Sequence, residues 1–254
     1  MHYQAVATAK SPALVIYLLD ISKSMAEQFD GRPKISHLND SLNDVISQMV
    51  ERSTKGEVIA KRYHLAMCAY SDKANDVLGG IMTIDEVAKK GRIDLSPLSM
   101  TDTAAAFRWA RDLLKSELPK RSGHDPVHPA PMLCHLTDGY FTGDDPEPIA
   151  REIMQMATDD GNVLIENIYV GPNMTKQPIG EPTEWPGIFD INELSDPYAQ
   201  KLFNMSSLLP EGYADFINVE AAYNLKPNSK MLIPGNNREL IELAFAMSGL
   251  TPFT

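Results

Sequence analysis

The sequence lacks an excess of basic residues, and it lacks any hydrophobic run long enough to cross a bilayer. Its 254 residues include 34 acidic and 23 basic side chains, which gives a formal net charge of −11. This charge disfavours a phosphate backbone as the main partner, so we expect no nucleic-acid ligand. No apolar stretch approaches the roughly 18 residues of a membrane span, so we expect no membrane partner.

Cysteine is also scarce, and the pattern of a secretory signal is missing. Cys68 and Cys134 are the two cysteines, and each lies inside a predicted strand. Two cysteines in such positions do not make a disulfide framework, so we interpret them as reduced packing residues of a reducing compartment. Residues 1–10 contain no basic segment followed by an apolar core. The predicted location is therefore cytoplasmic.

The most informative segment is an apolar run that ends abruptly in polar residues. Residues 14–19 have the sequence LVIYLL, and Asp20, Ser22 and Ser24 follow at alternate positions. An apolar run without alternation predicts a strand buried on both faces, and open α/β sheets place ligands at the carboxyl ends of such strands. Oxygen ligands there suit Mg²⁺, Mn²⁺ or Ca²⁺. The same residue types also occur in ordinary helix caps and turns.

Two later segments support the metal-site interpretation. Residues 131–136 form a second short apolar run, which ends at Thr137, Asp138 and Gly139. Thr101 lies in a loop just before a predicted helix. Because one parallel sheet can bring these three loops together, we predict a metal site built from five oxygen-bearing residues. They are Asp20, Ser22, Ser24, Thr101 and Asp138.

These motifs resemble those of von Willebrand factor type A (VWA) domains that carry a metal-ion-dependent adhesion site. The family pattern is Asp-x-Ser-x-Ser, then a Thr in a Gly-x-Thr-x-Thr-like loop, then the Asp of Thr-Asp-Gly. The likeness is good over residues 12–170 and looser beyond. Ser99 stands where the family usually has Gly, and Lys23 stands where Gly often occurs in the first motif. Neither change removes a ligand, but Lys23 would place a cation close to the metal loop.

The resemblance implies a fold, a cofactor and a partner. The fold would be α/β and doubly wound, with a mostly parallel central sheet flanked by helices. Ser22, Ser24 and Thr101 would contact Mg²⁺, or alternatively Mn²⁺ or Ca²⁺, while Asp20 and Asp138 would act largely through water or from behind these ligands. A Glu or Asp side chain of a protein partner would complete the coordination. The chain would then be an interaction module, acting as an intracellular adaptor in a multi-protein system.

Two other functions stay open. A Mg²⁺-dependent phosphoryl-transfer enzyme can also carry an Asp after its first strand, but aspartate-phosphorylating phosphatases need a second acid where this chain has Ser22. The sequence contains neither a Gly-x-x-x-x-Gly-Lys-Ser/Thr loop nor a Gly-x-Ser-x-Gly elbow, so we predict no enzyme activity and no catalytic residue. The second alternative is a structural scaffold that uses the VWA fold without metal.

Strands and helices alternate along the chain, as in α/β proteins. Ser36 or Asn39 would cap the first helix, and Asp144 and Asp145 would cap the fourth rather than bind metal. The predicted strands after the first cover residues 63–71, 77–81, 131–136, 162–170 and 213–219, and the predicted helices cover 36–51, 83–90, 103–116, 146–158, 197–209 and 238–247.

We expect a single VWA domain over residues 1–254, with loop insertions near 171–193 and 220–235. The first insertion contains four prolines together with Trp185 and Phe189, two large apolar side chains. Such a long loop inside a compact domain is unusual, and we expect these two residues to hold it against the body. The sequence makes no prediction about the oligomeric state.

Overall fold

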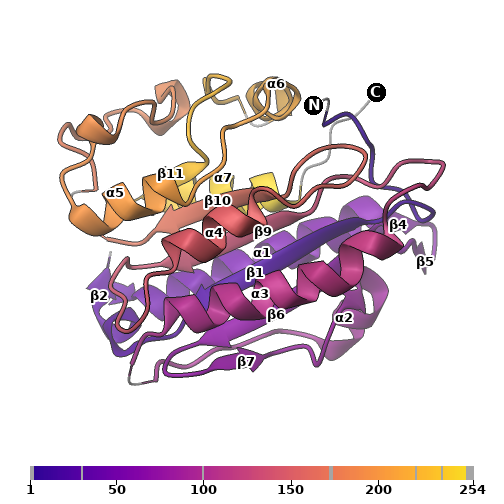
Figure 1. Cartoon of the computed structure of the whole chain (residues 1–254), viewed down its shortest axis with the longest axis horizontal. Coiled ribbons are helices and arrows are strands. Elements are labelled where there is room, and N and C mark those ends of the chain that lie inside the picture. Colours follow the sequence, from indigo (N-terminus) through magenta and orange to yellow (C-terminus); the bar gives the residue numbers. More distant parts are fainter. Residues whose placement is uncertain are drawn as a thin grey trace.

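A seven-stranded, mostly parallel sheet forms the centre of the protein (Figure 1). This computed structural model describes residues 3–29, 31–98, 100–171, 174–220, 222–235 and 237–249. Ser99, one of the two departures from the family pattern, lies outside these residues.

The strand order of the sheet is β11, β10, β9, β1, β6 and β7, and β8 also pairs with β6. The strands from β11 to β6 run parallel, whereas β7 and β8 are antiparallel to β6. This architecture confirms the α/β fold class expected from the sequence. The bounds are β1 Ala13–Asp20, β6 Tyr63–Tyr70, β7 Ala74–Asp76, β8 Met82–Thr83, β9 Met132–Thr137, β10 Leu164–Tyr169 and β11 Leu232–Pro234.

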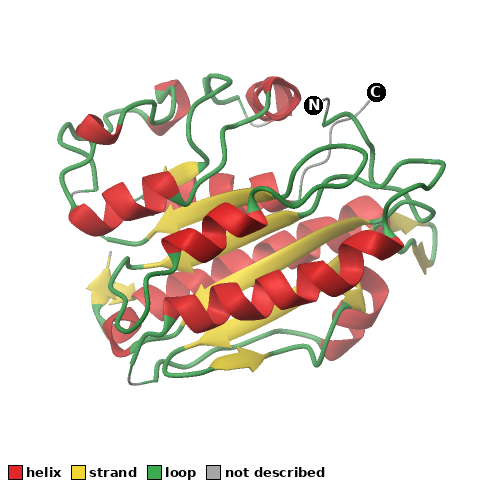
Figure 2. Cartoon of the chain, viewed as in Figure 1, coloured by secondary structure: helices red, strands yellow, loops and turns green. Residues whose placement is uncertain are grey.

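Helices cover both faces of the sheet (Figures 1 and 2). Helices α1 (Lys34–Ser53), α2 (Ile84–Lys90) and α7 (Arg238–Ser248) pack together on one face, and α3 (Thr103–Glu117) and α4 (Glu147–Ile153) pack on the other. Helix α5 (Pro197–Asn204) follows α4 on the second face, and α6 (Glu211–Glu220) lies near the amino-terminal segment. Within the described ranges, no helix combines the length and apolar character that a membrane crossing requires.

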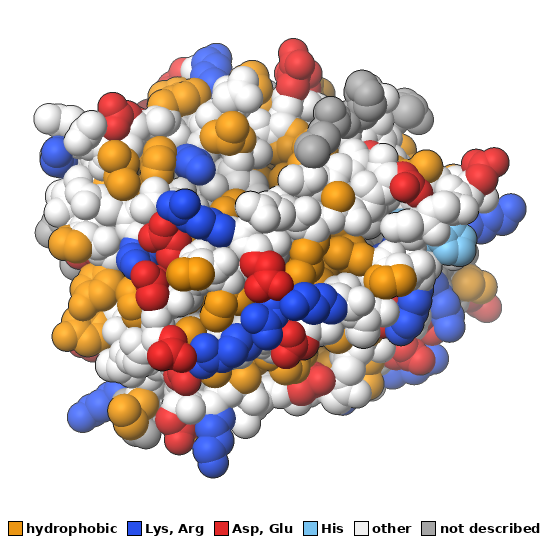
Figure 3. Space-filling view, in the orientation of Figure 1, with side chains coloured by type: hydrophobic (Ala, Val, Ile, Leu, Met, Phe, Trp, Pro, Cys, Tyr) orange, Lys and Arg blue, Asp and Glu red, His pale blue; other side chains and the backbone are white. Residues whose placement is uncertain are grey.

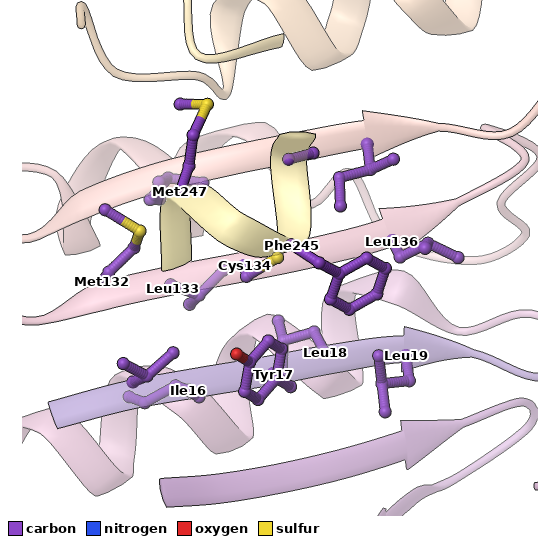
Figure 4. Packing of buried hydrophobic residues seen from close by; sticks show 14 of the residues in the cluster. Ile16, Tyr17, Leu18, Leu19, Met132, Leu133, Cys134, Leu136, Phe245 and Met247 are labelled. Carbon is purple, nitrogen blue, oxygen red and sulfur yellow. The ribbon is translucent and has the colours of Figure 1, made fainter. Parts of the chain in front are cut away.

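Strand β1 is the central element of the core. All eight of its residues are buried, as predicted for a strand covered on both faces. On the α7 side, the rings of Tyr17 and Phe245 stack with their centroids 6.1 Å apart, and the Tyr17 hydroxyl shares a 2.7 Å hydrogen bond with Ser248 (Figure 4). These contacts fix the closing helix against the middle of the sheet.

The two cysteines are both buried and unpaired. Cys68 lies on β6 and Cys134 lies on β9, and strand β1 runs between these two strands. In the register, Leu18 of β1 pairs with Cys68 and Tyr17 of β1 pairs with Cys134. Because a whole strand separates them, the two thiols pack as small apolar groups on different parts of the sheet.

The prediction of a last strand over residues 213–219 is wrong. This segment is helix α6, in which Tyr213, Ala214 and Ile217 are buried at helical spacing. The edge strand of the sheet is instead β11, which lies within the segment that we expected to be an insertion at 220–235. Three residues that include Pro234 give too short a pattern to indicate a strand.

Two smaller predictions also differ from the structure. The edge strand expected at 77–81 is replaced by β7 and β8, because Gly79 and Gly80 both have positive φ angles and turn the chain between them. Helix α1 begins at Lys34, and neither predicted cap residue caps it. The Asn39 side chain instead bonds both backbone groups of Leu95.

Residues 172 and 173 of the first predicted insertion lie outside the described residues, and the rest of it contains two short 3₁₀ segments, Pro182–Glu184 and Ile191–Glu193. Trp185 is buried against the core, which agrees with the expected role of holding the loop, whereas Phe189 is about half exposed. Only one of the two large apolar residues therefore anchors this segment.

A buried chain of hydrogen bonds joins β6, β9 and β10. His135 accepts a hydrogen bond from the Tyr70 hydroxyl at 2.6 Å, and its other ring nitrogen donates to Asn167 at 2.7 Å. Asn167 in turn donates to Ser206 at 2.8 Å. Burial lowers the pKa of His135 from 6.5 to about 4, so the ring is neutral at pH 7.

We expect His135 to make the fold sensitive to acid. Because its pKa is lower in the folded protein than in the unfolded chain, the stabilisation is present above pH 6.5 and is lost as the pH falls towards 4. Between pH 7 and pH 5, the free energy of unfolding should fall by about 2 kcal/mol more in the wild type than in His135→Gln. Urea denaturation of both proteins at the two pH values measures this difference, and parallel losses would show that His135 does not contribute.

Candidate metal site

Asp20 is the last residue of β1, and its carboxylate is completely buried. One oxygen accepts a hydrogen bond from the backbone N–H of Ser22 at 2.8 Å, and the other accepts one from the Thr137 hydroxyl at 2.8 Å. The carboxylate is therefore held between its own loop and the end of the neighbouring strand β9.

Ser22 and Ser24 lie in the turn that follows β1. A short 3₁₀ helix, η1 (Lys23–Ala26), shapes this turn, and the buried side chain of Met25 anchors it in the core. The two serine hydroxyl oxygens lie 2.9 Å apart. Three of the five predicted ligands thus come together through local folding alone.

Thr101 lies in the loop before α3, and this loop is tied to the carboxyl ends of several strands. The N–H of Leu98 donates to the carbonyl of Ile21 at 2.6 Å, and the N–H of Asp102 donates to that of Ser71 at 2.5 Å. The carbonyl of Thr101 accepts hydrogen bonds from both the N–H and the hydroxyl of Thr142. Thr101 is therefore buried between the loop after β1 and the loop after β9.

Asp138 directly follows β9, and only 5% of its side chain is exposed. The next residue, Gly139, has a φ of +86°, and a Cβ atom there would lie 2.5 Å from the ring of Tyr169. Only glycine fits this position, so Gly139 allows the chain to turn sharply after Asp138. The Gly139 N–H donates to the Thr137 hydroxyl at 2.9 Å, which links this turn to Asp20.

The charge of Asp138 acts on the nearby carboxyl group of Asp20. Burial and then the nearby charge of Asp138 raise the pKa of Asp20 to about 7, although hydrogen bonds from Ser22 and Thr137 oppose the shift. A buried carboxylate with a second carboxylate beside it is stabilised by a cation. The electrostatics of this edge therefore favour a positively charged ligand.

Lys34 supplies one positive charge at this edge, which we did not predict from the sequence. Its ammonium nitrogen lies 3.5 Å from Asp138 Oδ2 and 3.0 Å from Glu27 Oε2, with 8% of the side chain exposed. Lys23, the cation that we expected near the metal loop, is exposed to solvent. The antiparallel pairing of β2 (Gln28–Phe29) with β3 (Arg32–Pro33) reverses the chain and brings Lys34 back to the site. Since this placement depends on the pairing, no sequence motif indicates it.

The residues present fit a divalent metal ion that prefers oxygen. The candidate donors are two carboxylates and three hydroxyl groups, which are hard ligands of the type that Mg²⁺, Mn²⁺ and Ca²⁺ accept. In the part of the chain that the structure describes, no three His, Cys, Asp or Glu side chains form a metal-binding cluster. The assignment of the five ligands remains a prediction.

Comparison with known proteins gives structural likeness only. No family model and no curated protein matches the sequence. The pilus adhesin SpaC from Lactobacillus rhamnosus GG has a TM-score of 0.57 and 10% identity to this chain. The match covers 94% of this chain but 30% of SpaC, so the chain spans less than a third of that protein.

Two further structures show weaker likeness. The conserved hypothetical protein BatB from Bacteroides thetaiotaomicron has a TM-score of 0.45 at 16% identity, over 64% of this chain and 69% of BatB. Proximal thread matrix protein 1 from the mussel byssus, with a zinc-occupied MIDAS motif, has a TM-score of 0.41 at 14% identity, over 66% of this chain and 38% of that protein. At this identity the likeness to SpaC concerns the fold alone, a mostly parallel sheet with helices on both faces, which is the architecture that we expected for a VWA fold.

The Thr137 hydroxyl should contribute to stability through its two buried hydrogen bonds. Thr137→Val keeps the shape but leaves Asp20 and Gly139 without this partner, so we expect a loss of about 1 to 3 kcal/mol in chelator. Urea denaturation measures the loss. Thr175→Val is a matched control, because its hydrogen bond to the carbonyl of Gln177 is exposed. Equal stability of the two variants would contradict the role given to Thr137.

Proposed function

We propose that this chain is a metal-dependent protein-interaction module. The ion would bind at Asp20, Ser22, Ser24, Thr101 and Asp138, and a partner protein would add a Glu or Asp side chain to it. The observation that carries the proposal is the meeting of two aspartates, whose side chains are 5% exposed or less, with two adjacent serine hydroxyls at the carboxyl edge of a parallel sheet. The resemblance of the chain to VWA domains also supports a role in protein interaction.

Each residue has a distinct part in this proposal. Ser22, Ser24 and Thr101 would offer neutral oxygens, while the hydrogen-bonded carboxylates of Asp20 and Asp138 would balance charge around the site. When bound, the ion would supply an electrophilic centre that accepts one more anionic oxygen. Because Asp20 is fixed by Ser22 and Thr137, the chain holds its side of the site in place before a partner arrives.

The surface around the candidate site is suited to a protein. Leu98, Met100 and Tyr140 are 49%, 56% and 59% exposed, and they lie on the two loops that carry Thr101 and Asp138. The Tyr140 ring packs against Tyr198 with centroids 5.1 Å apart. Figure 3 shows hydrophobic side chains exposed at the end of the sheet to which the strands point in Figure 1. Aromatic and Met side chains of this kind are enriched at protein interfaces.

The most prominent basic side chains in Figure 3 lie among acidic ones. On α3, Arg108 pairs with Asp144, and both Arg111 and Lys115 pair with Glu152. These ion pairs offset the positive charges of Arg108, Arg111 and Lys115, which supports a protein rather than a nucleic acid as partner.

Binding rather than catalysis is the function that we propose. The residue two positions after Asp20 is Ser22, where aspartate-phosphorylating phosphatases need a second acid, and its hydroxyl oxygen lies 2.9 Å from that of Ser24. His135, on the adjacent strand, is buried and bonded on both ring nitrogens, so it cannot take a proton from a substrate at the surface. An intracellular adaptor role is also part of the proposal, and the buried unpaired thiols of Cys68 and Cys134 support it.

Metal uptake should depend on the two serine hydroxyls. We expect wild-type protein to bind one Mn²⁺ or Mg²⁺ ion and Ser22→Ala with Ser24→Ala to bind it roughly tenfold or more weakly, because two ligands are lost. Isothermal titration calorimetry measures the affinity, and circular dichroism checks that the fold is intact. Ser47→Ala with Ser116→Ala removes two exposed serine hydroxyls and is the control. Equal uptake by all three proteins would reject these ligands, whereas no uptake by any of them would favour the metal-free scaffold.

Partner binding should need both the ion and the apolar surface beside it. With a protein captured by the wild type in Mg²⁺, we expect binding to be lost in excess chelator, and Tyr140→Ser to weaken it roughly tenfold without changing Mn²⁺ affinity. Val58→Ser, at an exposed apolar residue of the hairpin of β4 (Thr54–Lys55) and β5 (Val58–Ile59), is the control. Surface plasmon resonance gives the affinities. Undiminished binding in chelator would place the interaction elsewhere.

A further inference from the structure

Lys34 introduces a fixed positive charge beside the candidate metal ligands. We propose that Lys34 sets the ion affinity of this site, because its ammonium group competes with a divalent cation for Asp138 and repels that cation. This inference rests on the proposed metal site and concerns how tightly the site holds its ion.

The position of Lys34 is determined by the backbone on both sides of it. The pairing of β2 with β3 reverses the chain, and the N–H of Lys34 donates to the carbonyl of Glu27 at 3.0 Å. Helix α1 begins at Lys34, so its main chain is also held by the first helical turn. The β2–β3 pairing before Lys34 and helix α1 after it therefore place the ammonium group between the Glu27 and Asp138 carboxylates.

Burial makes this charge effective. Only 8% of the Lys34 side chain and 5% of the Asp138 side chain are exposed, so water and salt screen their interaction poorly. Glu27, the second partner of the ammonium group, is 67% exposed and is screened far more. The exposed Lys23 lies in the same loop as the serine ligands, yet solvent weakens its field. Lys34 thus has a stronger influence on the ion than Lys23.

The charge of Lys34 also favours an anionic ligand on the loaded site. The carboxylates of Asp20 and Asp138 would together balance a divalent ion, and Lys34 would then leave an excess of positive charge. A carboxylate from a partner would neutralise that excess. Glu27 can retain the ammonium group by its existing ion pair when Asp138 turns towards the ion. One lysine would therefore weaken metal binding and strengthen the need for an acidic ligand.

The test is a titration of Mn²⁺ alone at low ionic strength, by isothermal calorimetry, into wild type, Lys34→Met, Lys34→Gln and Lys23→Met. We expect both Lys34 variants to bind Mn²⁺ on the order of tenfold more tightly than the wild type, because a buried repulsive charge is removed. Lys23→Met should stay within about twofold of the wild type. Lys34→Gln keeps a polar side chain, so it covers the case in which Lys34→Met fails to fold.

Thermal unfolding provides a second readout. In chelator, Lys34→Gln should melt below the wild type because Asp20 and Asp138 lose their nearby cation, and Mn²⁺ should raise its melting temperature by more than it raises that of the wild type. The two proposals fail differently. Equal Mn²⁺ uptake by wild type and the double serine variant rejects the metal site. If the wild type binds Mn²⁺ and Lys34→Gln binds it no more tightly than the wild type, the role of Lys34 is overturned. Absence of Mn²⁺ binding in every protein also overturns it, and uptake that appears only in the Lys34 variants supports it.

Discussion

The burial of two aspartates at one edge of the sheet is the constraint on which the rest of the site depends. Asp20 has no exposed surface and only 5% of the Asp138 side chain is exposed, so neither charge is fully stabilised by water. Neighbouring residues supply what water cannot: the Ser22 N–H and the Thr137 hydroxyl donate to Asp20, and the Lys34 ammonium group lies beside Asp138. The pKa of Asp20 is nevertheless raised to about 7. The Lys34 ammonium group therefore compensates the negative charge of the two aspartates only in part, and a bound cation would compensate the rest.

Sequence patterns predict the centre of this protein better than its periphery. The apolar run of β1 and the polar residues after it predict both a buried parallel strand and the place of the candidate site, because a continuous apolar run has few other uses. Residues 213–219 also resemble a strand, but three buried residues at helical spacing make that segment α6. The true edge strand β11 has three residues, and its identity depends on pairing with β10 rather than on its own sequence.

The same division holds within the site. Asp20, Ser22 and Ser24 are close in sequence, so their spacing alone predicts that they meet, whereas Thr101 and Asp138 are expected there only through sheet topology and family resemblance. Lys34 could not be predicted, because it arrives through the short pairing of β2 with β3 and has no characteristic neighbours. Lys23 lies in the metal loop as expected but is exposed to solvent, because proximity in sequence does not determine whether a long side chain is buried.

Ion and partner are linked in this arrangement by charge. If an acidic side chain of the partner binds the ion, then the partner must raise the ion affinity by the same factor by which the ion raises the partner affinity. Because Lys34 leaves excess positive charge on the loaded site, a carboxylate from the partner should raise the ion affinity by a larger factor than it would in a site without this lysine. The apolar side chains of Met100 and Tyr140 contribute contact area that does not depend on charge. Recognition would then require an acidic residue beside an apolar surface, a combination that free carboxylates and exposed acidic loops do not provide.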